Sequence, residues 1–427
     1  MLRNRAVAAA LAAAAALAVL PAATPAAASP PATVTEAACP RLSADLPWYG
    51  ANRAKLQRTI DERGRCGDPH PDRKPVAAFD WDNTVVKNDV TDATLAWALA
   101  HDKILRPKSW RERSKWLTDA ADKALTEACG TGVPVGAPLP TSTDTGCADE
   151  IFEIRENART MSGDPAFEGE WNHRRTVPEY AWVPQLFSGH TVGELSTYAR
   201  KARAEALAAP VGATRQVGTH TIPAYVRYYD QQRDLIRTLK RAGFDVWIVS
   251  AGSEPVTEVW SKGVGVDRAH TVAIRSVLDG EGRITPYNEG CGGVGRTKGE
   301  AIPYIDGKRC WINQEIFGVK GAKAWQQQDA TRRIALGGGD ADTDVTFVGD
   351  ATGAHLLLNR NKDEAMCRAY DNADGRWVIN PMFIEPMKKK TEPYPCATAA
   401  YNEEDGAKGP VRRADGSVVP DQRDTVY

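Results

Sequence analysis

Short apolar runs that end at a small or polar residue recur along this chain. Four of them stand out: 76–79 before Asp80, 246–249 before Ser250, 334–336 before Gly-Gly-Gly-Asp340, and 345–348 before Gly349 and Asp350. Runs of this length, bounded by turn residues, are typical of strands that are buried on both faces of a parallel sheet. We therefore predict four core strands at these positions.

Helical patterns lie between the predicted strands. Residues 222–242 carry apolar and aromatic side chains at helical spacing just before the second strand. Alternation of helix and strand over this length predicts an α/β fold with a doubly wound, Rossmann-like parallel sheet. Ligands of such folds bind at the carboxyl ends of the strands, where Asp80, Ser250 and Asp340 would all lie.

The segment 91–211 lacks strand-like runs and carries helical patches at 93–101, 109–128 and 192–208. We interpret it as a helical cap inserted into a catalytic core that comprises residues 75–90 and 212–400. Residues 29–74 form an N-terminal segment before the core. Residues 401–427 are polar and charged and offer little to bury, so we expect a mobile tail.

Residues 1–28 have the organisation of a secretory signal peptide. Arg3 and Arg5 precede an Ala/Leu/Val run to Leu20, and small residues follow Pro21. A membrane anchor is the alternative, but the run is shorter than the roughly 20 residues that a spanning helix needs. We expect a secreted, extracellular protein without stable membrane insertion.

The chain has eight cysteines, an even number that suits an oxidising compartment. Connectivity does not follow from sequence alone, but the cysteines group into four close pairs. The grouping suggests bonds between Cys39 and Cys66, Cys129 and Cys147, Cys291 and Cys310, and Cys367 and Cys396. A zinc site is the alternative, although the chain has no C-x-x-C and no paired Cys/His spacing.

The formal net charge is −1, and acidic and basic residues are interleaved along the chain. Such a chain presents no polybasic region for nucleic acid or for an anionic membrane. We expect a small-molecule partner, and the oligomeric state stays open.

Asp80 and Asp82 follow the first predicted strand within the sequence Asp-Trp-Asp-Asn-Thr-Val. Their spacing projects both carboxylates to the same side of the chain. One carboxylate can attack phosphorus to form an acyl phosphate, and the other can protonate the leaving oxygen and later deprotonate water. A solvated acidic turn is the alternative interpretation of these residues.

This sequence resembles the first motif, D-x-D-x-[TV], of the haloacid dehalogenase superfamily of phosphatases. The second motif of that family is a Ser or Thr that ends the next core strand, and Ser250 matches it. The resemblance implies that Ser250, with Ala251 beside it, binds the phosphoryl group. The motifs together cover residues 75–361.

The third family motif is a lysine with loose sequence context. Lys298 follows a predicted hairpin and opens a helical pattern, so the resemblance implies that Lys298 neutralises the phosphoryl group and the Asp80 carboxylate. Arg296 is the competing candidate.

The fourth family motif, G-D-x-x-x-D, is present as Gly339, Asp340 and Asp344. The resemblance implies a Mg2+ site formed by Asp80, the backbone carbonyl of Asp82 and Asp340, with Asp344 beside them. We interpret Asp342 as a solvated turn residue. Gly349 and Asp350 offer a second Gly-Asp, but Ala354 stands where that motif needs an acid.

Together these motifs imply a secreted phosphomonoesterase that works through a phosphoaspartyl intermediate. By motif wording the chain is most similar to secreted phosphorylcholine phosphatases, so phosphorylcholine or a related phosphoamine is the leading substrate hypothesis. The insertion is also rich in aromatic residues, which can bind quaternary ammonium groups or simply pack between helices. A phosphoserine-like or broad-specificity phosphatase, and a non-catalytic secreted binding protein of the same fold, are the alternatives.

Overall fold

A six-stranded parallel sheet forms the centre of the computed structural model, which describes residues 38–66, 74–402 and 405–426. The strand order is β12-β11-β10-β1-β6-β7, and every pairing between neighbours is parallel. The strands are β1 (Val76–Phe79), β6 (Asp245–Ser253), β7 (Thr271–Ile274), β10 (Leu336–Gly339), β11 (Ala354–Asn359) and β12 (Trp377–Pro381). The predicted α/β fold class is confirmed.

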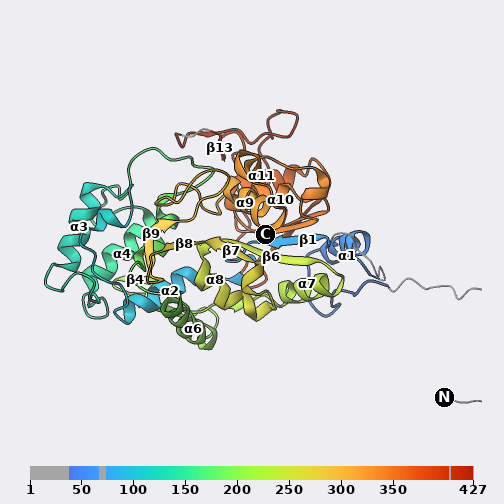
Figure 1. Ribbon diagram of the computed structural model, residues 1–427. Coiled ribbons are helices and arrows are strands. Elements are labelled where there is room, and N and C mark those ends of the chain that lie inside the picture. The colour runs from blue at the N-terminus through green and yellow to red at the C-terminus, as the bar shows by residue number, and fades with distance from the viewer. Residues whose placement is uncertain (1–37, 67–73, 403–404, 427) are drawn as a thin grey trace, which may run out of the picture. The chain divides into compact units, whose positions relative to one another are not determined.

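Both faces of the sheet are buried. In β1, Ala77 and Phe79 belong to one apolar cluster, whereas Val76 and Ala78 belong to another, as the alternation of side chains along a strand requires. Figure 1 shows α9, α10 and α11 on one side of the strands and α7 and α8 on the other. The helices around the sheet are α1 (Asn52–Arg63), α7 (Asp230–Arg241), α8 (Glu254–Ser261), α9 (Asp306–Trp311), α10 (Val345–Gly349) and α11 (Asp363–Asp371).

The segment 91–211 folds almost entirely as helices and loops (Figure 1). Its helices are α2 (Val90–Ala100), α3 (Asp119–Cys129), α4 (Thr145–Asn157), α5 (Pro178–Leu186) and α6 (Val192–Ala208). Capping residues fix where two of these helices begin. The Asp89 side chain accepts hydrogen bonds from backbone N–H groups at the start of α2, and Thr191 and Glu194 form a capping box at the start of α6. The assignment of this segment as a separate cap remains a prediction.

Short antiparallel ribbons complete the described fold. They pair β2 (Val86–Lys87) with β5 (Arg227–Tyr228), β3 (Thr214–Val217) with β4 (His220–Pro223), β8 (Ser276–Leu278) with β9 (Ile284–Asn288), and β13 (Ala400–Tyr401) with β14 (Lys408–Gly409). The predicted helix at 222–242 is therefore too long, because its first third forms β4 and β5 and helix α7 begins at Asp230.

The predicted strand at 345–348 is wrong. These residues form α10, because a short apolar run is compatible with a buried helix as well as with a buried strand. The next strand of the chain after β10 is instead β11, at Ala354–Asn359.

The described part of the polar tail is packed rather than loose. Val411 and Val419 are buried, and Asp424 accepts hydrogen bonds from Tyr370 and from the Lys390 backbone. The prediction of a mobile tail is wrong for these residues, because a few buried valines and hydrogen bonds hold a segment whose overall composition is polar.

All four proposed disulfides are present: Cys39–Cys66, Cys129–Cys147, Cys291–Cys310 and Cys367–Cys396. None of the helices in the described ranges is both long and apolar enough to cross a bilayer. The predicted signal peptide at 1–28 lies outside the described residues.

Candidate active site

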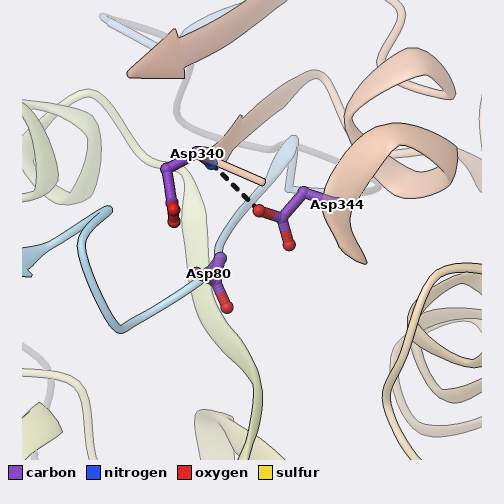
Figure 2. Close-up of side chains that lie close together, drawn as sticks. All are labelled: Asp80, Asp340 and Asp344. Carbon is purple, nitrogen blue, oxygen red and sulfur yellow. Dashed lines mark hydrogen bonds between the residues drawn. The ribbon is translucent and has the colours of Figure 1, made fainter. Parts of the chain in front are cut away.

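Three aspartates meet at the carboxyl ends of two adjacent strands. Asp80 follows β1 and Asp340 follows β10, and these strands pair directly. Asp344 reaches the same point from the start of α10, as Figure 2 shows. One oxygen atom from each of the three carboxylates lies within 4.8 Å of the others, and all three residues are buried.

The glycines of β10 make this approach possible. A Cβ at Gly339 would lie 2.5 Å from the Asp344 Cβ, and one at Gly338 would lie 2.5 Å from the Phe79 ring. Asp344 in turn holds the loop, because its Oδ2 accepts from the backbone N–H of Asp340 at 2.9 Å (Figure 2) and from that of Ala341 at 3.0 Å.

Lys308 joins the cluster from α9. Its ammonium Nζ lies 2.5 Å from Asp80 Oδ1 and 2.6 Å from Asp344 Oδ1, and the residue has no exposed surface. Burial alone would lower the pKa of Lys308, but the adjacent Asp344 and Asp80 charges outweigh it, so the pKa is raised and the lysine stays charged.

Lys298 does not reach Asp80. Its Nζ donates to the backbone oxygen of Glu112 at 2.8 Å, and the competing Arg296 pairs with Glu289. The prediction that Lys298 contacts the Asp80 carboxylate is therefore wrong, because the lysine that does so comes ten residues later, on α9. No local signal in the sequence distinguishes the two, since each lysine lies next to a glycine and within two residues of an acidic residue.

Asp82 lies beside the start of α2. Its Oδ1 accepts from the backbone N–H of Val90 at 2.8 Å. Burial raises the pKa of the Asp82 carboxyl, and the nearby Asp89 and Asp80 charges raise it further. A raised pKa favours the protonated form that a general acid requires.

Ser250 is fully buried near the end of β6, the other neighbour of β1, and its Oγ accepts from the Gly252 N–H at 3.0 Å. Ser250 and Ala251 both line the cavity that also contains Asp80. The structure thus brings together all of the predicted site residues except Lys298.

Thr84 and Arg360 complete the surroundings of Asp340. Thr84 Oγ1 donates to Asp340 Oδ1 at 2.6 Å, and Arg360 Nη1 donates to Asp340 Oδ2 at 2.7 Å. Sequence reasoning missed Arg360, although a signal exists: it follows the apolar strand β11 just as Asp80 follows β1.

Asp342 is not a solvated turn residue, which corrects the sequence interpretation. Its Oδ1 accepts from the Ala365 N–H of α11 at 2.9 Å, and burial raises the pKa of its carboxyl to about 6. The alternative Asp350 lies elsewhere, where it pairs with Arg309 through both carboxylate oxygens.

The donor set fits a hard divalent cation. In the cluster, the three carboxylates of Asp80, Asp340 and Asp344 contact the cations Lys308 and Arg360, which leaves one negative charge uncompensated. Burial raises the pKa of Asp80, and the neighbouring Asp344 and Asp340 charges add to it, although Lys308 opposes the rise. Mg2+ prefers carboxylate oxygens and would supply the missing charge.

A cavity of about 400 Å³ opens above the cluster. Outside the cluster, its acidic residues outnumber its basic ones. The acids are Asp82, Asp89, Asp92, Glu156, Glu179 and Asp342, and the bases are Arg155, Arg360 and Lys362. The Tyr180 and Tyr304 rings form part of the wall, with their centroids 5.7 Å apart.

No protein-family model matches this sequence, and none of the curated proteins matches it. Solved structures do. A conserved functionally unknown protein from Anaerococcus prevotii DSM 20548 is similar with a TM-score of 0.54 and 17% identity, covering 79% of this chain and 93% of that one. At this identity the likeness shows the α/β fold and assigns no activity.

Two further similar structures have lower scores. A protein of unknown function from Bordetella pertussis Tohama I has a TM-score of 0.41 and 16% identity, over 73% of this chain and 99% of that one. A substrate-bound phosphoserine phosphatase complex has a TM-score of 0.31 and 13% identity, over 69% of this chain and 91% of that one.

Proposed function

We propose that this chain is a Mg2+-dependent phosphomonoesterase of the haloacid dehalogenase type that works through a phosphoaspartyl intermediate on Asp80. The observation that carries the proposal is the contact of buried Lys308 with both Asp80 and Asp344, beside Asp340 and at the ends of adjacent strands. An ammonium and a metal site on either side of one carboxylate suit the transfer of a highly charged phosphoryl group.

In the first step an Asp80 carboxylate oxygen attacks phosphorus, the bond from phosphorus to the ester oxygen breaks, and Asp82 gives its proton to that oxygen. In the second step Asp82 takes a proton from water, whose oxygen attacks phosphorus, and the bond to Asp80 breaks to release phosphate. Ser250 and the Ala251 backbone hold the phosphoryl oxygens, and Lys308 stabilises their charge.

Asp80, Asp340 and the Asp82 carbonyl would hold Mg2+, and Asp344 would fix the loop beside it. The bound ion would neutralise charge on the nucleophile and on the phosphoryl oxygens. In this arrangement Arg360 holds the second oxygen of Asp340.

We propose phosphorylcholine or a related phosphoamine as the substrate. The excess of acidic residues in the cavity favours a cationic leaving group, because a positive charge there offsets the carboxylates of Glu156 and Glu179. The faces of Tyr180 and Tyr304 offer further contact for an ammonium group. The disulfides agree with our proposal that the chain acts outside the cytoplasm.

The test is phosphate release from phosphorylcholine, phosphoserine and p-nitrophenyl phosphate, with and without Mg2+, for wild type and Asp80→Asn. Magnesium-dependent turnover that the substitution abolishes is expected. The variant Glu179→Gln should raise KM for phosphorylcholine and leave KM for p-nitrophenyl phosphate unchanged, because the nitrophenyl group carries no positive charge. Folded wild type that releases no phosphate from any ester would instead favour a binding protein of this fold.

A further inference from the structure

Arg174 connects the inserted segment to three other parts of the chain. Its guanidinium binds both oxygens of Asp306, with Nε to Oδ2 at 2.9 Å and Nη2 to Oδ1 at 3.0 Å. It also donates to Thr346 Oγ1 at 3.1 Å and to the backbone oxygen of Tyr401 at 2.9 Å. These partners lie in α9, in α10 and in the C-terminal region.

Asp306 is the first residue of α9, the helix that carries Lys308. Helix α9 has six residues, and even with the five π-helical residues that follow it directly, Ile312–Ile316, it is too short to be stable through its own backbone hydrogen bonds. Contacts from outside must therefore hold it. Arg174 supplies two kinds of contact, because its backbone oxygen also accepts from the Asp306 N–H at 2.8 Å.

The residue before α9 is strained. Ile305 has φ of 48° and ψ of −104°, and positive φ is a rare and costly conformation for a β-branched residue. Strain of this kind persists only where the surroundings over-determine the backbone. Ile305 is fully buried and its N–H donates to the Thr343 oxygen at 3.0 Å, so the contacts on both of its sides keep it in place.

We propose that Arg174 is a positioning residue for the reaction: it holds Asp306, thereby fixes the start of α9, and so sets Lys308 against Asp80. The inference rests on the proposed function in one respect, that Lys308 stabilises the phosphoryl group. It also makes the inserted segment part of the reaction machinery, because a residue of that segment determines where the lysine of the core lies.

The geometry makes the arginine hard to replace. A guanidinium matches the two oxygens of a carboxylate, whereas a lysine ammonium presents a point charge. Loss of the charge leaves Asp306 with Thr346 as its remaining side-chain partner, and it also removes a cation 3.7 Å from the fully buried Glu364.

The first measurement is the rate at which acetic anhydride modifies Lys308, followed by mass spectrometry on the folded full-length protein. Lys308 is fully buried and should be strongly protected in wild type. In Arg174→Met we expect modification of Lys308 to be faster by on the order of tenfold, because the charged hydrogen bonds that hold the start of α9 in place are lost. This readout does not depend on phosphatase activity.

The matched control is Arg413→Met. Arg413 also binds both oxygens of an aspartate, Asp371, but it lies in the C-terminal segment away from α9. The control should leave Lys308 protected. Lys308 that stays equally protected in folded Arg174→Met would overturn the proposal.

The second measurement is the kinetics of p-nitrophenyl phosphate hydrolysis. Arg174→Met should lower kcat by about tenfold with little change in KM, since a displaced transition-state contact affects kcat. Arg174→Lys should recover part of kcat, and Arg413→Met should match wild type.

The experiments distinguish failure of the proposed function from failure of the role proposed for Arg174. Absence of turnover in wild type would refute the proposed function, and the modification rates would still decide the role of Arg174. If Arg174→Met does not fold, Arg174→Lys decides instead, and a Lys308 that is as protected as in wild type would then count against the proposal.

Discussion

Lys308 Nζ lies 2.5 Å from Asp80 Oδ1, although the two residues are 228 positions apart in the chain. Both are buried, and each offsets the cost of removing the other from water. Asp344 shares the same ammonium at 2.6 Å. This contact distinguishes two lysines that the sequence leaves equivalent.

Lys308→Met should reduce kcat for phosphate release by about 10²- to 10³-fold, the usual cost of losing one group that stabilises transition-state charge. Lys298→Met is the matched control and should retain nearly full kcat, because Lys298 contacts the Glu112 backbone. Initial rates, with circular dichroism to confirm folding, check both. A loss of activity in Lys298→Met with full activity in Lys308→Met would contradict this assignment.

Mg2+ should stabilise the folded protein against heat. Binding to the native state alone adds about 2.7 kcal/mol at a free metal concentration of 100 Kd. Asp340→Asn should remove most of the Mg2+-dependent rise in Tm. Asp350→Asn, which changes the other Gly-Asp sequence and lies in the ion pair with Arg309, should keep it. Equal Mg2+ responses in the two variants would argue against a metal at Asp340.

The disulfide between Cys291 and Cys310 should matter for turnover as well as for stability. Cys310 is in α9, two residues after Lys308. Replacing both cysteines by alanine should lower the free energy of unfolding by about 3 kcal/mol, as expected for a loop of this length. It should also reduce kcat, because no covalent bond would then hold α9, and with it Lys308, in place.

The control for that variant is the Cys129–Cys147 pair. Its sequence separation is 18, against 19 for Cys291–Cys310, so the loss of stability should be similar. It joins α3 to α4 and has no cysteine in α9, so it should leave kcat unchanged. Denaturant titration and initial rates separate the two effects, and an equal fall of kcat in both variants would exclude a specific role of the α9 disulfide.

His220 should make stability depend on pH. Its Nδ1 lies 3.0 Å from Asp149 and its Nε2 lies 2.8 Å from Glu153. Burial lowers the pKa of His220, but the hydrogen bonds to Glu153 and Asp149 raise it by more, so the net shift is upward. The stabilisation is therefore full below the unfolded pKa of about 6.5 and is lost as pH rises through the folded pKa.

His220→Gln should accordingly lower Tm more at pH 5 than at pH 9. Thermal unfolding at both values tests this, and the control is His101→Gln, because the His101 ring contacts the Trp97 backbone oxygen and no carboxylate of the described residues is among its hydrogen-bond partners. A difference in Tm that is the same at both pH values would show that His220 contributes packing rather than charge.

Residues 76–80 show how far local sequence reaches. The apolar run, the acidic turn after it and the spacing to Asp82 are all short-range features, so strand β1 and the position of Asp80 could be predicted. The same holds for Asp340 and Asp344, whose spacing places both on one loop. The cysteine pairs were also predictable because each bond closes a short stretch of chain.

The roles of Lys308, Arg360 and Arg174 were not predicted from the sequence. Lys308 and Arg174 act through partners 228 and 132 positions away, Asp80 and Asp306, and Arg360 reaches Asp340 from the end of a different strand. The apolar run 345–348 likewise became a helix, because short runs carry no period that separates helix from strand. The sequence by itself determined the strand ends and the acids on them. Tertiary structure decided which cations meet those acids, because that choice depends on packing between distant elements.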